Sequence, residues 1–299
     1  MKQRSQINRN KIIGLLLISP WLLGFILFKL LPIIASLVLS FTDFHMLKPE
    51  EVQYIGLDNY VRLFRDDAVG YLLFETISLA ITTIPLQLVA SISLAALLNS
   101  RRLKASTNIR TLFFLPSIIP GVAIAFMWLG FADPATGWLN RFILQPLGLT
   151  GFSNVYSDAA IALLFTISSL WGIGPGMMII LGAMQGVPSE IMEAAQVDGA
   201  GPLMRFFRVT LPIISPAIFF SLIINLVAIF GGVLLLDRGN VFSNSASPFD
   251  GYISYMLFEQ WQLGYAASLS WFFLILVMVV IVALFASSRR WVYYPDQES

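Results

Sequence analysis

The sequence has no cysteine, a single histidine and few charged residues. The absence of cysteine excludes disulfides and thiolate metal sites within the chain. The lone histidine, His45, lies in a polar stretch, which excludes a histidine-based dyad or zinc site in the apolar segments and favours a solvated residue. Charged residues make up 12% of the 299 residues and hydrophobic residues 57%, a balance that excludes an ordinary soluble domain.

Two further features are missing. No Gly-x4-Gly-Lys-Ser/Thr segment occurs, so the chain has no P-loop to hold ATP. No basic patch suited to nucleic acid stands out, and we expect no nucleic-acid partner. Any ATP that drives this protein therefore binds to another subunit.

Six long apolar runs make up most of the chain, at residues 12–40, 76–98, 111–132, 159–184, 211–236 and 266–286. A helix needs about 20 apolar residues to cross a bilayer. The runs are continuously apolar rather than alternating, which favours helices over a β-barrel. The sequence therefore predicts an all-α membrane protein with six transmembrane helices surrounded by lipid. Prolines predict kinks in these helices, at Pro85, Pro116, Pro120, Pro175 and Pro216.

The distribution of basic residues predicts the orientation of the chain. One set of loops and termini carries Lys2, Arg4, Arg9, Lys11, Arg101, Arg102, Lys104, Arg110, Arg205, Arg208, Arg289 and Arg290, whereas the other carries Lys48, Arg62, Arg65, Arg141 and Arg238. By the positive-inside rule, both termini are cytoplasmic. We expect a cytoplasmic N-terminus at 1–11, a transmembrane domain at 12–286 and a cytoplasmic tail at 287–299. Lys29 remains inside the first run, where it either snorkels or faces protein.

The cytoplasmic loop at 187–210 contains a spaced pattern. Glu193-Ala194-Ala195-Gln196-Val197-Asp198-Gly199 is followed, after nine residues, by Val209-Thr210-Leu211-Pro212. Ser189 is a good N-cap for a short helix, and Gly199 suits the left-handed turn that ends it. Pro202 then favours a second short helix through Arg208, and Leu211-Pro212 is expected to open the fifth span.

This pattern resembles the EAA loop of ABC-importer permeases, with Val209 in place of the usual Ile. The resemblance implies a type I ABC-importer permease fold whose loop is a coupling helix that fits a cleft on a separate ATPase. It assigns the ATPase contact to Glu193, close packing to Ala194 and Ala195, and the turn to Asp198 and Gly199, with Leu211 and Pro212 completing the pattern. The chain itself is then not an enzyme and holds no cofactor, because ATP and Mg are bound by the ATPase.

Other segments resemble the carbohydrate branch of these permeases, which includes the maltose importer. They are Ser40-Phe41-Thr42-Asp43, Gly56-Leu57-Asp58-Asn59-Tyr60, Leu112-Phe113-Phe114-Leu115-Pro116 and Gly264-Tyr265-Ala266-Ala267-Ser268-Leu269-Ser270. The resemblance implies a second permease subunit, two ATPase subunits and an extracytoplasmic solute-binding protein, in a bacterial or archaeal cell (inner) membrane. One departure is the run from Gly231 to Asn240, where many relatives have a Thr-x-Gly-Gly-Pro-like turn.

In such relatives the sugar site lies between the fourth and fifth spans. The residues here that fit it are Trp171, Gly172, Ser221, Asn225, Ile229 and Gly232. A Trp face stacks on a pyranose ring, and an Asn amide both donates to and accepts from hydroxyls. The alternative is that Asn225 bonds across helices and Trp171 is an interface aromatic.

The predicted function is that of a permease subunit that forms half of the path for a sugar, oligosaccharide or polyol. A permease for another solute, such as a glycerol phosphate, is an alternative. A secondary transporter needs ionisable groups deep in the spans, and these are nearly absent. An intramembrane enzyme needs a nucleophile–base pair or a metal set, which one loop histidine and no cysteine disfavour.

Overall fold

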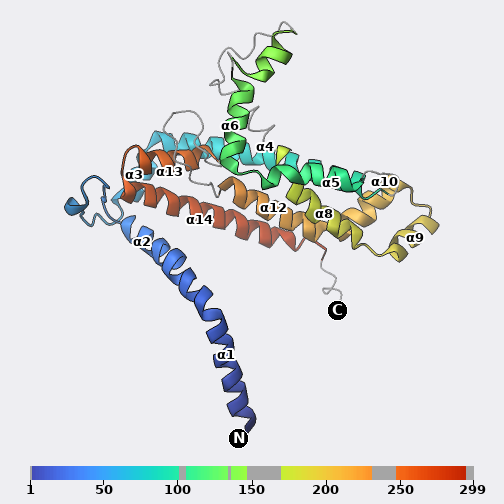
Figure 1. The fold of residues 1–299 in the computed structure, drawn as a ribbon, viewed down its shortest axis with the longest axis horizontal. Coiled ribbons are helices and arrows are strands. Elements are labelled where there is room, and N and C mark those ends of the chain that lie inside the picture. Colours follow the sequence, from blue (N-terminus) through green and yellow to red (C-terminus); the bar gives the residue numbers. More distant parts are fainter. Residues whose placement is uncertain (1, 101–105, 134–135, 147–169, 231–246, 294–299) are drawn as a thin grey trace. The chain divides into compact units, whose positions relative to one another are not determined.

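The structure is a computed structural model that describes residues 2–100, 106–133, 136–146, 170–230 and 247–293 (Figure 1). In these ranges all regular elements are helical, and one isolated bridge pairs Thr42 with Tyr54. The chain divides into two compact units. The first joins residues 1–69 to 253–275, and the second joins 70–252 to 276–299.

The first unit begins with a long helical segment made of α1 (Lys2–Phe25), η1 (Ile26–Leu30) and α2 (Leu31–Leu39). The wide π turn of η1 precedes Pro32, whose missing N–H disturbs the regular bonding of the helix. A short 3-10 turn, η2 (Pro49–Glu51), and the helix α3 (Asp58–Arg65) follow. Asp58 occupies the first turn of α3, and Leu57 is its N-cap.

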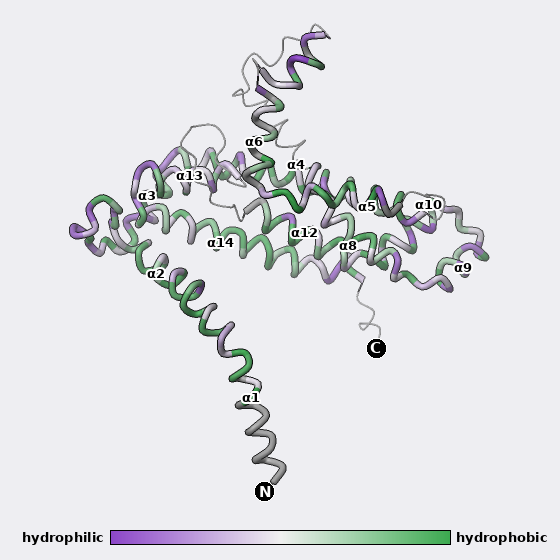
Figure 2. The backbone as a smooth tube through the Cα atoms, viewed as in Figure 1, coloured by the Kyte–Doolittle hydropathy of each residue, from purple (hydrophilic) through white to green (hydrophobic). Residues whose placement is uncertain are grey.

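The remaining helices continue through the second unit, and three of them, α4, α13 and α14, also supply residues to the first. They are α4 (Asp67–Leu98), α5 (Ser106–Phe114), η3 (Leu115–Ile118), α6 (Gly121–Ala132), η4 (Asn140–Leu144), α8 (Gly174–Gln185), α9 (Ser189–Val197), α10 (Pro202–Arg205), η5 (Phe206–Thr210), α11 (Leu211–Ile213), α12 (Ser215–Phe230), α13 (Pro248–Phe258) and α14 (Leu263–Ser288). Figure 2 shows that hydrophobic residues dominate α14, the most apolar of the long helices.

Three of the described helices are long and apolar enough to cross a membrane: Leu16–Leu39, Asp67–Leu98 and Leu263–Ser288. A bent pair, Pro202–Ile213 and Ser215–Ala228, makes a fourth if it counts as one span. These match the predicted first, second, sixth and fifth runs. The third run is divided into α5, η3 and α6 around Pro116 and Pro120, and the fourth is described only from residue 170. The count of six spans therefore stays a prediction.

Two apolar clusters hold the second unit together. Ala80 and Ile84 of α4 pack against Leu226 of α12, with residues of α14 around them. The other cluster joins α4 and α8 to Ile214, with Met177 and Ile180 fully buried.

Small residues allow these helices to approach closely. A Cβ atom added to Gly176 would lie 3.1 Å from Ser221 Oγ and 3.2 Å from Ser91 Oγ.

Candidate functional site

The helix α9 carries the Glu-Ala-Ala pattern and ends in a defined turn. Gly199 has φ +82°, and its N–H donates to Gln196 O at 3.1 Å, while Ala200 N–H donates to Ala195 O at 3.0 Å. These two bonds form a Schellman motif, which needs a left-handed residue at the glycine position. Gly199 therefore ends the helix, as expected. Ser189 was expected as the N-cap but is the first helical residue, and Pro188 takes the capping position.

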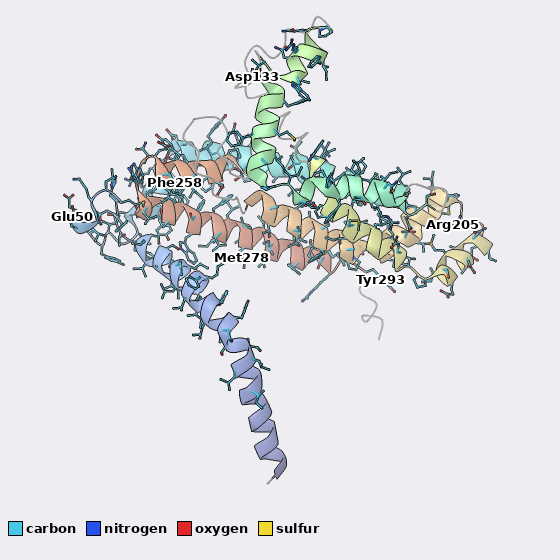
Figure 3. The ribbon with its side chains drawn as sticks, viewed as in Figure 1. Glu50, Asp133, Arg205, Phe258, Met278 and Tyr293 are labelled. Carbon is cyan, nitrogen blue, oxygen red and sulfur yellow. The ribbon has the colours of Figure 1, made fainter. Side chains whose placement is uncertain are left out.

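The second short helix is tied to α9 by side chains. Arg205 of α10, labelled in Figure 3, donates from Nη1 to Gln196 Oε1 at 3.0 Å. Thr210, which is buried, donates to Met192 Sδ at 3.8 Å. The sequence pattern predicted neither of these side-chain contacts. These contacts join α9 to the helical run 202–213. The segment from 187 to 210, which contains α9 and most of that run, is called the 187–210 loop.

Charged and apolar side chains are exposed together on this loop. Glu190, Glu193 and Asp198 are exposed, as is Ala194, and Ala195 is half-buried. Val197 is 87% exposed and Leu203 75% exposed. Apolar side chains therefore lie exposed among charged ones on this loop. Val197 and Leu203 were absent from the predicted site; their apolar character within a polar loop was the available signal.

The loop joins α12 at a sharp bend. The axes of Pro202–Ile213 and Ser215–Ala228 differ by 66°. Pro216 has no N–H to bond with the carbonyl of Pro212, and the hydroxyl of Ser215 donates to that oxygen instead, at 2.7 Å. The same Ser215 Oγ accepts the backbone N–H of Tyr293 at 2.8 Å. Leu211 begins the short helix α11, with Pro212 in its first turn, and the bend follows after Ile213, next to Pro216. That Leu211-Pro212 opens the fifth span stays a prediction.

Three of the segments that resemble the carbohydrate branch come together in the first unit. Asn59 donates from Nδ2 to the carbonyls of Ser40 and Thr42, at 2.9 and 2.8 Å. A Cβ atom at Gly264 would collide with the carbonyl oxygen of Thr42. These contacts fix the end of α2 against α3 and the start of α14, so the three segments share a structural role.

A second set of bonds holds the same region. Tyr265 donates from its hydroxyl to Asp66 Oδ2 at 2.8 Å. The guanidinium of Arg62 lies 3.9 Å from the centre of the Tyr265 ring and donates to Gln262 Oε1 at 2.8 Å. Stacking on the ring and bonding to the amide orient Arg62 at the start of α14. This network explains why Tyr265 follows Gly264 in the sequence pattern.

The expected substrate residues lie in different surroundings. Ser221 is 1% exposed beside Gly176, and its Oγ has no hydrogen-bond partner. Asn225, one turn later in α12, is half-buried, and its side chain makes no hydrogen bond to the described residues. Trp171 and Gly172 lie at a helix break before α8. Ile229 belongs to α12, and Gly232 lies outside the described residues.

Trp171 lines a cavity of about 560 Å³. The other lining residues are Phe126, Met127, Gly130, Phe131 and Trp138. The described lining is aromatic and apolar, and α12 contributes no residue to it. Stacking surfaces for a sugar ring are therefore present beside Trp171, whereas the hydroxyl-binding amide of Asn225 is not part of this lining.

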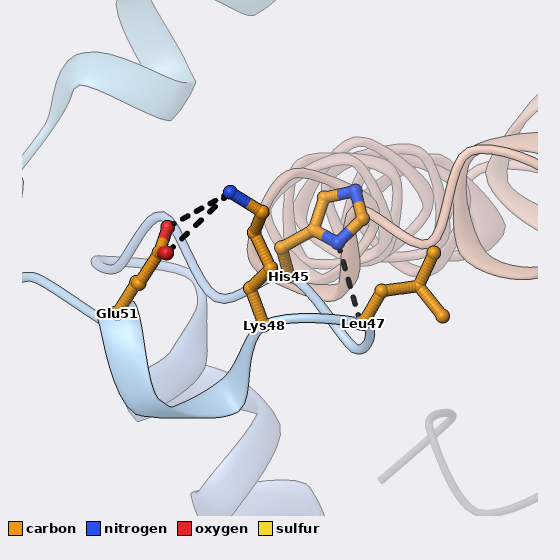
Figure 4. Close-up of polar contacts among 4 residues, drawn as sticks. All are labelled: His45, Leu47, Lys48 and Glu51. Atoms are coloured by element: carbon orange, nitrogen blue, oxygen red, sulfur yellow. Dashed lines mark hydrogen bonds and ion pairs between the residues drawn. The ribbon is translucent and has the colours of Figure 1, made fainter.

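The single histidine lies in the loop after α2 (Figure 4). His45 Nδ1 accepts the backbone N–H of Leu47 at 3.3 Å, and Lys48 pairs with Glu51 at 3.1 Å beside it. The described part of the chain contains no group of three or more His, Cys, Asp or Glu side chains able to hold a metal ion. His45 thus stabilises a local turn.

Residues 87–293 match the family described as binding-protein-dependent transport system inner membrane component. The match includes the whole 187–210 loop and its bend. The chain belongs to this permease family. The permease is also 34% identical over 307 residues to the probable ABC transporter permease protein YesP of Bacillus subtilis, covering 100% of this chain and 97% of that one.

Two further relatives have named cargoes. The permease is 28% identical to AraP, an arabinooligosaccharides transport system permease of Halalkalibacterium halodurans, over 92% of this chain and 87% of that one. It is 32% identical to UgpA, an sn-glycerol-3-phosphate transport system permease of Yersinia pestis, over 60% of each chain.

Among solved structures, a chain of a bacterial alginate ABC transporter in complex with an alginate pentasaccharide-bound periplasmic protein shares the fold. The TM-score is 0.79 at 24% identity, over 97% of this chain and 98% of that one. The permease therefore has the all-helical type I ABC permease fold.

Proposed function

We propose that this permease is a subunit of an ATP-driven importer for a sugar or oligosaccharide. It crosses the membrane six times, with both termini and the 187–210 loop in the cytoplasm. The observation that carries the proposal is the structure of that loop. A helix with a fixed end presents Glu193, Ala194 and Val197 on a projection tied to α12, as expected of a part that docks into another protein.

The partners follow from this role. Two ATPase subunits bind ATP and Mg and dock on the 187–210 loops, because this chain has no P-loop of its own. A second permease subunit completes the path, and an extracytoplasmic binding protein delivers the cargo. The alginate transporter with its periplasmic protein supports the last assignment. The complex resides in the cell membrane of a bacterium or archaeon.

The cargo assignment rests on relatives and on chemistry. AraP and the alginate transporter are named for oligosaccharides and a polysaccharide. Trp171 and Trp138 present aromatic faces to one cavity, and Asn225 and Ser221 supply polar groups within a span. We place substrate contacts at Trp171, Gly172, Ser221, Asn225, Ile229 and Gly232. The name of UgpA makes sn-glycerol 3-phosphate the alternative cargo.

The mechanism we propose is alternating access driven from the cytoplasm. Closure of the ATPase dimer moves the 187–210 loop, and the link between Gln196 and Arg205 makes its two helices move together. The motion reaches α12 at Ile214 and reorganises the helices that pack there. Chemistry belongs to the ATPase; this chain supplies the gate, part of the substrate path and the coupling helix.

The test of coupling is a charge reversal at Glu193. We expect Glu193→Lys to remove most of the ATPase that co-purifies with the tagged permease, because the substitution reverses the charge at the docking surface. Glu190→Lys is the matched control, since Glu190 is exposed on the same helix and carries the same charge. Membrane insertion of both variants is checked by the yield of tagged protein. Wild-type amounts of ATPase on Glu193→Lys would reject the coupling role.

The test of cargo uses the co-purified binding protein. Its melting temperature is measured with a panel of neutral oligosaccharides, acidic oligosaccharides and sn-glycerol 3-phosphate. We expect an oligosaccharide to raise it most. A rise with sn-glycerol 3-phosphate alone would select the alternative cargo. Asn225→Ala is then expected to weaken uptake of the identified cargo while ATPase binding is kept.

A further inference from the structure

Lys29 is a cation in the middle of an apolar span. The span Leu16–Leu39 has a mean hydropathy of 2.5, and none of its most apolar stretch is buried in this chain. Lys29 lies about 20 Å from one end and about 15 Å from the other, at 1.5 Å per residue. It is exposed, and no hydrogen bond or ion pair to the described residues satisfies its ammonium group.

Snorkelling does not resolve this position. A lysine side chain reaches about 6 Å from its Cα, given standard bond lengths. Side chains on a helix lean toward its N-terminus, which for Lys29 is the more distant end of the span. The ammonium therefore stays inside the hydrocarbon region, too deep for a lipid phosphate. A charge there is costly and needs a partner.

No carboxylate of this chain lies within the six apolar runs, and Glu75 of α4, at the edge of run 76–98, accepts from the Tyr71 hydroxyl. The first acidic residue is Asp43, beyond the span, and none of the other five apolar runs contains an Asp or Glu. A second copy of this chain would bring the same six runs, which contain no Asp or Glu. The counter-charge therefore comes from a different membrane protein.

We propose that Lys29 docks this span onto a transmembrane helix of the second permease subunit, where its ammonium donates hydrogen bonds to a carboxylate. This inference rests on the proposed function, which supplies the second subunit. The stacked Trp21–Phe25 pair precedes Lys29 in the span. Ser36, which accepts from Trp271 Nε1 at 3.2 Å, follows it. The exposed surface between them is apolar, and Lys29 is its one charge. The lysine then sets the register of the two helices.

The test measures assembly in the full complex. The tagged chain is expressed with its partner subunits and purified in a mild detergent, and the second permease and the ATPase are quantified per tagged chain. We expect Lys29→Leu to lower the second permease about tenfold, the loss typical of a charged hydrogen bond. Lys29→Arg retains it. Lys11→Leu, the same change at the cytoplasmic end of α1, is the control and also retains it.

A photo-crosslinking residue at position 29 identifies the neighbour directly. A covalent product with the second permease supports the proposal. It is overturned if the product contains only lipid or a second copy of this chain, or if Lys29→Leu keeps the second permease at the wild-type level. Failure of the proposed function is distinguishable, because the wild-type chain would then co-purify with neither a second permease nor an ATPase.

Discussion

Single glycines decide how closely segments of this permease approach each other. Gly264 lies against the backbone of Thr42 and Phe44, so a side chain there meets atoms that belong to another segment's main chain. Gly70, in α4, has open space around its missing Cβ. A methyl group at position 264 would therefore collide with the main chain, whereas one at position 70 would meet no atom. Substitution to alanine tests this difference.

We predict that Gly264→Ala destabilises the protein by about 1–3 kcal/mol, the usual cost of overpacking. The expected readout is a lower melting temperature in detergent. Gly70→Ala is the matched control and should leave the melting temperature unchanged or slightly higher, because alanine favours helix. Equal melting temperatures for the two variants would show that the Thr42 contact does not constrain position 264.

Asp250 is a buried acid of the second unit. It is 9% exposed in the first turn of α13, and its Oδ2 has no hydrogen-bond partner. Burial penalises the charged form and raises the pKa of the carboxyl above its ordinary value of 3.8. The folded state therefore favours the protonated acid, and the stabilisation it contributes is present below 3.8 and lost as pH rises through the raised pKa.

The predicted consequence is a pH-dependent stability that Asp250→Asn removes. From mildly acidic to neutral pH, the melting temperature of the wild type should fall more than that of the variant, because only the wild type must ionise a buried group. Thermal unfolding of both proteins across this range checks it. Parallel curves would mean that Asp250 does not contribute to the pH dependence.

At the scale of an element, the α9 turn is the most constrained feature of the 187–210 loop. The φ of +82° at Gly199 is available to glycine, tolerated by asparagine and strained for a β-branched residue. We predict that Gly199→Asn keeps ATPase co-purification, whereas Gly199→Val lowers it severalfold by unwinding the end of α9. Hydrogen exchange of α9 amides should rise in Gly199→Val only. If both variants bind ATPase equally, the left-handed turn is not required for docking.

Local signals in the sequence predicted much of this element and less of its surroundings. The helix end at Gly199 and the kink at Pro216 both follow from short-range backbone chemistry. The tie between Gln196 and Arg205 and the burial of Ser221 against Gly176 depend on residues distant in the chain. Such pairings depend on how helices pack, which periodicity alone does not specify.

The long apolar runs show the same limit. Runs 76–98 and 266–286 correspond to continuous helices, α4 and α14, although α4 begins at Asp67. Run 111–132 is divided, because Pro116 and Pro120 occur close together, whereas the single Pro85 leaves α4 continuous. Prolines were marked as kinks, but their different effects depend on the packing around each.

For the whole molecule, the orientation in the membrane is directly testable because the chain has no cysteine. We predict that Glu51→Cys, in the first outer loop, reacts with a membrane-impermeant maleimide in intact cells. Asp198→Cys should react only after permeabilisation, since the proposed topology puts the 187–210 loop in the cytoplasm. Both side chains are exposed, so accessibility within the fold is matched. The reverse labelling pattern would invert the topology.

In the proposed coupling, the bend at Ile214 sets the direction in which a movement of the 187–210 loop displaces α12. An angle of 66° is closer to a right angle than to a straight line, so a push along Pro202–Ile213 displaces the base of α12 mainly sideways. The hydrogen bond from Tyr293 N–H to Ser215 Oγ joins the bend to the segment that follows α14. In the proposed coupling, the loop therefore swings α12 sideways more than it moves the span along its own axis.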